Sequence, residues 1–141
     1  MSAAIRFMVP GKPVGKGRPR IGKVGRHARM FTPEKTVSYE GLVGWTAAQA
    51  MVGRAMVLGP VQVNLSIAMD VPASWSKVKQ ARALEGREFP TTKPDMDNVI
   101  KAIFDALNGV VWKDDVQVVA LSTSKTYGAA PGVTVEVWEV A

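Results

Sequence analysis

The sequence predicts one compact domain of the α/β (α+β) class, in which helices cover a mixed sheet of about four main strands. Its 141 residues match the usual size of one domain, since they can bury a core but are too few for two. Stretches of strict apolar–polar alternation are interleaved with stretches of helical spacing. We find no internal repeat or linker, so residues 1–141 are expected to form a single domain.

The first half of the chain predicts a strand, a helix and a second strand. Residues 5–9 alternate as a half-buried strand does, until Pro10 and Gly11 end it. Thr32 and Pro33 suit the start of a helix, and apolar residues recur at helical spacing as far as Val52. The clearest strand covers residues 61–70, and one of its faces is wholly apolar: Val61, Val63, Leu65, Ile67 and Met69.

The second half predicts two helices followed by two strands. A short helix begins at Ser74 and ends at Gly86, with Trp75, Val78 and Ala81 expected to face the core. A longer helix begins at Asp95 and ends at Gly109, with its core stripe formed by Met96, Val99, Ile100, Ile103 and Leu107. Strands are expected over residues 116–127 and 133–138. We also expect the tryptophans to pack in the core.

The positive charge of the chain is concentrated near its N-terminus. The net charge is +6, which favours polyanionic partners such as nucleic acid. A segment at about residues 11–30 is rich in glycine, contains no acid and holds seven basic residues: Lys12, Lys16, Arg18, Arg20, Lys23, Arg26 and Arg29. We interpret this segment as a mobile basic loop that contacts DNA. The alternative is a loop whose charges are simply solvated.

Several classes of protein are excluded by composition. The chain has no cysteine and a single histidine, His27, so disulfides, cysteine-based sites and chemistry that needs two histidines are excluded. The apolar stretches are shorter than the roughly 20 residues that a transmembrane helix needs, and the N-terminus lacks the apolar core of a signal peptide. We therefore expect a cytoplasmic protein with no membrane association.

Aspartates between residues 95 and 115 form the most informative pattern. On a helix that starts at Asp95, the side chains of Asp97, Lys101 and Asp105 share one face at spacings of four. If the chain then turns back, Asp114 and Asp115 return beside the helix start, so three or four carboxylates are expected to converge. Carboxylate oxygens are the ligands that Mg²⁺ prefers, and metal ions at such sites catalyse phosphoryl transfer.

Each of these residues also has a purely structural interpretation. Asp95 suits a helix N-cap, Asp97 and Lys101 suit a stabilising pair, and adjacent aspartates are common in turns. Asp105 is expected to be an exposed helix residue. Lys101 is either solvated or directed at the metal cluster, where it would orient water or stabilise a pentavalent phosphate.

Motifs along most of the chain together carry a specific resemblance. The central ones are Lys93-Pro94-Asp95-Met96-Asp97-Asn98 with Lys101, Asp105-Ala106-Leu107, and Asp114-Asp115-Val116-Gln117-Val118. Others are Gly17-Arg18-Pro19-Arg20, Phe31-Thr32-Pro33 and Pro72-Ala73-Ser74-Trp75-Ser76. In these motifs the chain resembles the RusA family of Holliday junction resolvases. The resemblance implies a homodimer of compact α/β domains, encoded by bacteria or by phages and prophages, that cleaves four-way DNA junctions with Mg²⁺, for which Mn²⁺ is a possible substitute.

The resemblance also implies roles for individual residues. The family's essential acids fall on Asp95, Asp97 and Asp115 as metal ligands, with Asp114 ranked second, and its essential lysine falls on Lys101. We add Lys93, which precedes the first aspartate, to the DNA-binding residues of the basic loop. Two other functions remain open: a different phosphoryl-transfer enzyme built on aspartates and metal, or a nucleic-acid-binding protein without catalytic activity.

Overall fold

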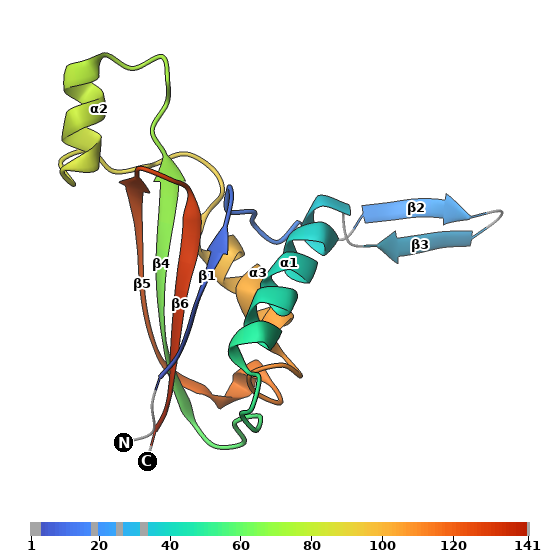
Figure 1. The fold of residues 1–141 in the computed structure, drawn as a ribbon. Coiled ribbons are helices and arrows are strands. Elements are labelled where there is room, and N and C mark those ends of the chain that lie inside the picture. Colours follow the sequence, from blue (N-terminus) through green and yellow to red (C-terminus); the bar gives the residue numbers. More distant parts are fainter. Residues whose placement is uncertain (1–3, 18–19, 25–26, 32–33, 141) are drawn as a thin grey trace.

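Four strands form the central sheet of the computed structural model, in the order β1-β6-β4-β5 (Figure 1). Their bounds are Ile5–Pro10 for β1, Val61–Asp70 for β4, Val118–Gly128 for β5 and Gly132–Glu139 for β6. The strand β6 pairs antiparallel with β1 and β4, whereas β4 and β5 are parallel. The predicted mixed sheet in a single α+β domain is thus confirmed. The structure describes residues 4–17, 20–24, 27–31 and 34–140, and for residues 20–24 and 27–31 it describes the backbone alone.

The inner face of the sheet carries the predicted apolar residues. In β4 every second residue is buried, and these are the five apolar residues that alternation assigned to one face. The strands β1 and β6 alternate in the same way. Because β4 and β5 are parallel, the chain between them must cross over, and this connection contains two α-helices and a short 3₁₀ helix.

Helices α1 (Glu34–Ala50) and α3 (Met96–Leu107) cover this inner face and contact each other (Figure 1). Their apolar faces complete the core, since Val43, Ala47, Val99, Ile103 and Leu107 are all fully buried. The predicted stripe on the longer helix is therefore confirmed. Gly109, just beyond α3, has a φ of 79°, a conformation that favours glycine and ends the helix where the sequence predicts.

Helix α2 (Lys77–Leu84) lies outside this core, and its predicted orientation is wrong. Val78 is 68% exposed and Ala81 is also exposed, whereas Ala83 is buried. The helix contacts the edge strand β5, beside which Trp75 packs edge-on against Tyr127 with ring centroids 5.2 Å apart. A helix that rests on one strand needs only a narrow apolar stripe, so its exposed residues can include valine.

The basic segment contains a β-hairpin where the sequence predicted only a loop. Strands β2 (Arg20–Val24) and β3 (His27–Phe31) pair antiparallel, with Gly22 opposite Arg29 and Lys23 opposite Ala28. Figure 1 shows this hairpin extending away from the start of α1. Hydrogen bonds between two strands satisfy backbone groups without an apolar core, which explains why a basic, glycine-rich sequence forms them. Arg18 and Arg26 lie outside the described residues.

The tryptophans differ in their surroundings. Trp112 is fully buried and Trp75 and Trp138 are partly buried, but Trp45 on α1 is 64% exposed, which contradicts its expected core position. Helix periodicity places it opposite the buried residues Tyr39, Val43 and Ala47 of α1. In the part of the chain that the structure describes, no helix combines the length and apolar character needed to cross a membrane.

Candidate active site

The segment 12–17 joins the start of α1 to the start of α3. The amide of Lys16 donates to the carbonyl oxygen of Asn98 over 2.8 Å, and the amide of Gly17 donates to Thr36 Oγ1 over 3.0 Å. Gly15 packs so closely that an added Cβ would lie 3.0 Å from the Asn98 Cβ and 3.2 Å from the Pro94 Cβ. The close packing favours glycine at position 15. The two hydrogen bonds hold the starts of both helices in place relative to the segment.

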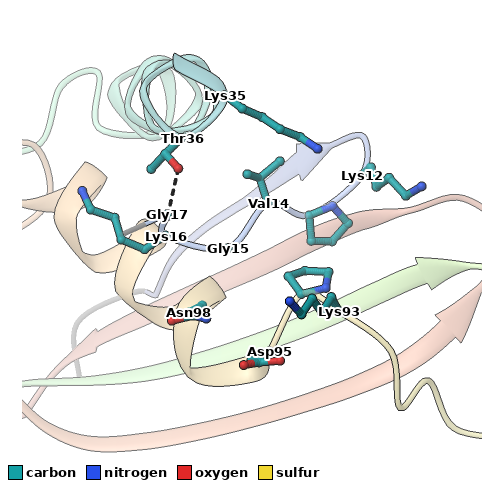
Figure 2. A pocket seen from close by; sticks show the side chains of 12 residues that line it. Lys12, Val14, Gly15, Lys16, Gly17, Lys35, Thr36, Lys93, Asp95 and Asn98 are labelled. Carbon is teal, nitrogen blue, oxygen red and sulfur yellow. Dashed lines mark hydrogen bonds between the residues drawn. The ribbon is translucent and has the colours of Figure 1, made fainter. Parts of the chain in front are cut away.

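A hollow of about 700 Å³ opens between these three elements (Figure 2). Its wall holds one acid, Asp95, and four lysines: Lys12, Lys16, Lys35 and Lys93. The amide side chain of Asn98 also reaches it. No role for Lys35 or Asn98 was predicted from the sequence. Lys35 is an ordinary residue for a helix start, and Asn98 is uncharged, although it stands inside the motif Asp95-Met96-Asp97-Asn98.

Asp95 is the N-cap residue of α3, and Asp97 lies in the first turn of this helix. Asp95 has N-cap backbone angles, with φ −67° and ψ 144°, but its carboxylate makes no capping hydrogen bond. Both side chains belong to exposed residues, and neither forms a hydrogen bond or ion pair with any other side chain that the structure describes. The geometry therefore does not support the capping role of Asp95 or the Asp97–Lys101 pair. Both carboxylates are left available to an external cation.

Lys101 instead belongs to a network of four charges that links the two helices and the segment 12–17. Lys101 Nζ lies 2.9 Å from Asp105 Oδ1, while Lys16 Nζ lies 3.1 Å from Asp105 Oδ2 and 2.6 Å from Glu40 Oε1. The side chain of Asp105 is only 21% exposed. The sequence predicted that Asp105 is an exposed helix residue, and this prediction is wrong. Its carboxylate contacts two lysines, one of which lies outside α3.

Electrostatics in this network favour the charged forms. Burial by itself would raise the pKa of Asp105, but hydrogen bonds from Lys101 and Lys16 outweigh it, so the pKa of that carboxyl is lowered. The hydrogen bond to Asp105 raises the pKa of Lys101, and the charge of Asp115 raises it further. Burial would lower the pKa of Lys16, yet its hydrogen bonds to Glu40 and Asp105 raise it. All three groups are ionised at neutral pH.

Asp115 contacts the far end of α3, whereas the sequence predicted that it returns beside the start of this helix. The turn after the helix is fixed by the fully buried Trp112, whose Nε1 donates to Asn108 Oδ1 over 2.7 Å. The Nδ2 of Asn108 faces Asp115 Oδ2 at 3.5 Å. Asn108 thus connects a core residue to a candidate metal ligand. No role for Asn108 was predicted from the sequence, because its contacts depend on how the chain folds back.

Asp114 has a different environment from its neighbour. Its Oδ1 accepts a hydrogen bond from the amide of Val116 over 3.1 Å and caps the short 3₁₀ helix at Asp115–Gln117. The side chain of Gln117 accepts from the amides of Lys113 and Asp114 and donates to the carbonyls of Val57 and Gly59. The Asp114 carboxylate is therefore used locally, whereas that of Asp115 faces α3.

The candidate residues divide into two groups along α3. Asp95 and Asp97 lie at its start beside Lys93, whereas Lys101, Asp105 and Asp115 lie farther along it. Among the residues that the structure describes, no three histidine, aspartate or glutamate side chains are grouped closely enough to hold a metal ion. The ligand set predicted from the sequence thus stays a prediction, although two of its three acids lie at the start of α3 and have no partner among the described side chains.

Comparison with known proteins gives a consistent result. The model of the family described as endodeoxyribonuclease RusA matches residues 10–138. The chain is 39% identical over 138 residues to the uncharacterized protein YqaN of Bacillus subtilis (strain 168), and the match covers 96% of both chains. The family match includes every motif in which the sequence resembles RusA proteins. The chain therefore belongs to the RusA family and is an endodeoxyribonuclease.

Proposed function

We propose that this endonuclease resolves four-way DNA junctions by hydrolysing phosphodiester bonds in strands of opposite arms, with Mg²⁺ as its cofactor and Mn²⁺ as a possible substitute. The main support is the arrangement at the start of α3. Asp95 and Asp97 lie at the start of α3 and have no partner among the side chains that the structure describes, and Asp95 lines a hollow with several lysines, so cation ligands lie close to phosphate-binding groups. A nucleic-acid-binding protein needs no free acids, and a different phosphoryl-transfer enzyme gives no account of a basic segment that suits a long polyanion.

The donor set fits a hard divalent cation. Asp95, Asp97 and Asp115 offer carboxylate oxygens, and the first two have no partner among the described side chains that would have to be displaced. When bound there, Mg²⁺ would supply charge neutralisation at the phosphodiester and a water molecule activated for attack. Asp114 is the weaker candidate because its carboxylate already caps the 3₁₀ helix.

Lys101 is assigned to the phosphate that is being cut. Its ammonium group is held by Asp105 on the same face of α3 as Asp97, and its raised pKa keeps it charged. A fixed positive charge is effective where negative charge develops in the transition state. Asp105, and through it Lys16, positions this lysine. We therefore regard Lys16 as a structural link to Glu40 rather than as a direct DNA contact.

The remaining basic residues are assigned to the DNA backbone. Lys12 and Lys93 border the hollow, and the hairpin carries Arg20, Lys23 and Arg29. Phosphate contacts of this kind position a duplex without reading its sequence, as an enzyme that recognises branch structure requires. Arg18 and Arg26 belong to the same basic segment and keep the same predicted role.

The direct test is cleavage of labelled DNA by wild-type protein and by Asp97→Asn. We expect wild type to cut a four-way junction in Mg²⁺ in preference to linear duplex or single strand, and Asp97→Asn to bind the junction without cutting it. Removing a carboxylate near phosphate lowers repulsion, so its affinity should be unchanged or higher. Asp70→Asn, an exposed acid at the end of β4, serves as the control.

Three results would reject parts of this proposal. Wild-type cleavage that persists in excess chelator would exclude the metal. Equal cutting of linear duplex would exclude junction selectivity. Binding without cutting by wild-type protein in Mg²⁺ and in Mn²⁺ would favour the non-catalytic alternative.

A further inference from the structure

The hollow beside Asp95 has the charge of a phosphate-binding site. Of the four lysines in its wall, Lys16 is already paired with Glu40 and Asp105, and Figure 2 shows its side chain pointing away from Asp95. Lys12, Lys35 and Lys93 are exposed and form no ion pair with any side chain that the structure describes. Three available ammonium groups around a single acid favour an anionic ligand.

The size of the hollow limits which part of DNA can enter it. A volume of about 700 Å³ lies in the range of pockets for small ligands, which is roughly 300 to 1,000 Å³. One or two nucleotides of a single strand fit such a space, whereas a duplex does not. Its wall also offers the apolar surface of Pro13, Val14 and Pro94 and the amide of Asn98, which suit a sugar or a base as well as phosphate.

The wall is held in place by contacts between three segments. The hydrogen bonds of the Lys16 and Gly17 amides fix segment 12–17 to both helix starts, and Gly15 packs against Pro94 and Asn98. Lys35 projects from the first turn of α1 across this space (Figure 2). The hollow is therefore formed by fixed backbone, with flexible lysines only at its rim.

We propose that the hollow binds one strand of branched DNA, separated from its complement, next to the phosphate that is cut, and that Lys35 contacts the backbone of this strand. In a four-way junction each strand passes from one arm to the next at the branch point, where it parts from one complementary strand and pairs with another. A linear duplex offers no separated strand inside the helix. The hollow thereby provides a physical basis for junction selectivity, and this inference rests on the proposed function.

The test measures binding without cleavage, at physiological salt and without divalent cation. Fluorescence anisotropy gives the affinity of Lys35→Glu for a four-way junction, a short single strand and a linear duplex. Lys77→Glu on α2 is the matched control, because it makes the same charge change at an exposed site on another element. At this salt, screening over about 8 Å limits the effect of a charge change to nearby phosphates. Melting temperatures confirm that each variant is folded.

We expect Lys35→Glu to weaken junction and single-strand binding about tenfold more than Lys77→Glu does, which is the typical effect of removing one charge-assisted hydrogen bond. Its affinity for linear duplex should match that of the control, and Lys35→Arg should restore junction binding. An equal loss on all three DNAs, or no loss beyond the control, would overturn the inference. Since no step requires cleavage, a failure of the proposed catalytic function would show separately in the Asp97→Asn experiment.

Discussion

Asp105 is the residue at which the segment 12–17 meets the candidate catalytic lysine. Its two carboxylate oxygens accept from different lysines, Lys16 and Lys101. Asp105→Asn removes the charge that holds both ammonium groups, so we expect cleavage within the bound complex to slow by about tenfold with little change in affinity. Single-turnover rates at saturating protein measure this. Equal rates in Asp105→Asn and wild type would show that Lys101 does not depend on Asp105.

The same variant has a predictable pH dependence. Because the pKa of Asp105 is lowered on folding, its carboxylate stabilises the native state above its ordinary pKa of about 3.9, and this stability is lost as the pH falls through the lowered value. The unfolding free energy of Asp105→Asn should therefore fall furthest below that of wild type at neutral pH, and the two should converge in acid. Urea titrations across this pH range provide the measurement. A constant difference would contradict the assignment.

Asp114 and Asp115 are adjacent but should respond differently to the same substitution. Asp115→Asn removes a carboxylate that faces α3, so we expect loss of cleavage with little loss of stability. Asp114→Asn weakens the cap on the 3₁₀ helix, with an expected cost of up to about 1 kcal/mol and only a modest loss of rate. Cleavage assays and thermal melting separate the two effects. The reverse ranking would make Asp114 the metal ligand.

The sequence allowed part of this site to be predicted. Helical spacing correctly placed Asp97, Lys101 and Asp105 on one face, because i to i+4 neighbours follow from helix geometry alone. It did not show that Lys101 pairs with Asp105 rather than Asp97. Asp105 also accepts from Lys16, which is distant in sequence and whose positive charge repels that of Lys101. A local pattern contains no information on such tertiary partners.

Among the elements, the hairpin of β2 and β3 was not predicted from the sequence, and neither was the 3₁₀ helix at Asp115–Gln117, where a strand was expected from residue 116. The hairpin strands are rich in glycine and basic residues and do not show a strict apolar–polar alternation. A two-stranded ladder can form without an apolar face, so this pattern was missing from the sequence. Strand β4 is the opposite case, because burial on one face imposes a strict period of two. Elements that pack on the core were therefore predicted well, whereas the hairpin that extends from it was not.

If the hairpin contacts DNA, its charges should determine part of the salt dependence of binding. Arg20→Ala with Arg29→Ala removes one positive charge from each strand. We expect weaker junction binding and a shallower plot of log affinity against log salt, by up to about 0.9 for each phosphate that the variant no longer neutralises. Lys77→Ala with Lys79→Ala on α2 removes the same total charge as a control. An unchanged slope in the hairpin variant would favour the solvated alternative.

At the scale of the whole molecule, the order of strands in the sheet could not be predicted from the sequence. Alternation predicted which residues face the core, but not that β5 pairs with β4 in parallel while β6 separates β4 from β1. Pairing is decided by contacts between distant segments, and several strand orders would bury the same apolar faces. The position of Asp115 follows from this order, since β5 begins directly after the 3₁₀ helix that contains it.

A single domain with one set of candidate ligands raises the question of how two strands are cut. Resolving a four-way junction into two duplexes requires a nick in each of two strands. A symmetric homodimer provides two identical sites, because a twofold axis places them on equivalent strands of an equally symmetric junction. We therefore predict that the protein sediments at twice its 15.2 kDa chain mass and nicks opposing strands at symmetric positions.

Mixed dimers test this mechanism directly. A dimer of one wild-type chain and one Asp97→Asn chain keeps both DNA-binding surfaces but has one functional set of ligands. It should nick one strand of each junction and leave the other intact, whereas a wild-type dimer cuts both before it dissociates. Differently tagged chains allow the mixed species to be purified, and denaturing gels with each strand labelled in turn distinguish one nick from two. A mixed dimer that still cuts both strands in one binding event would mean that one site serves both cuts, and a protein that stays monomeric on DNA would exclude paired sites altogether.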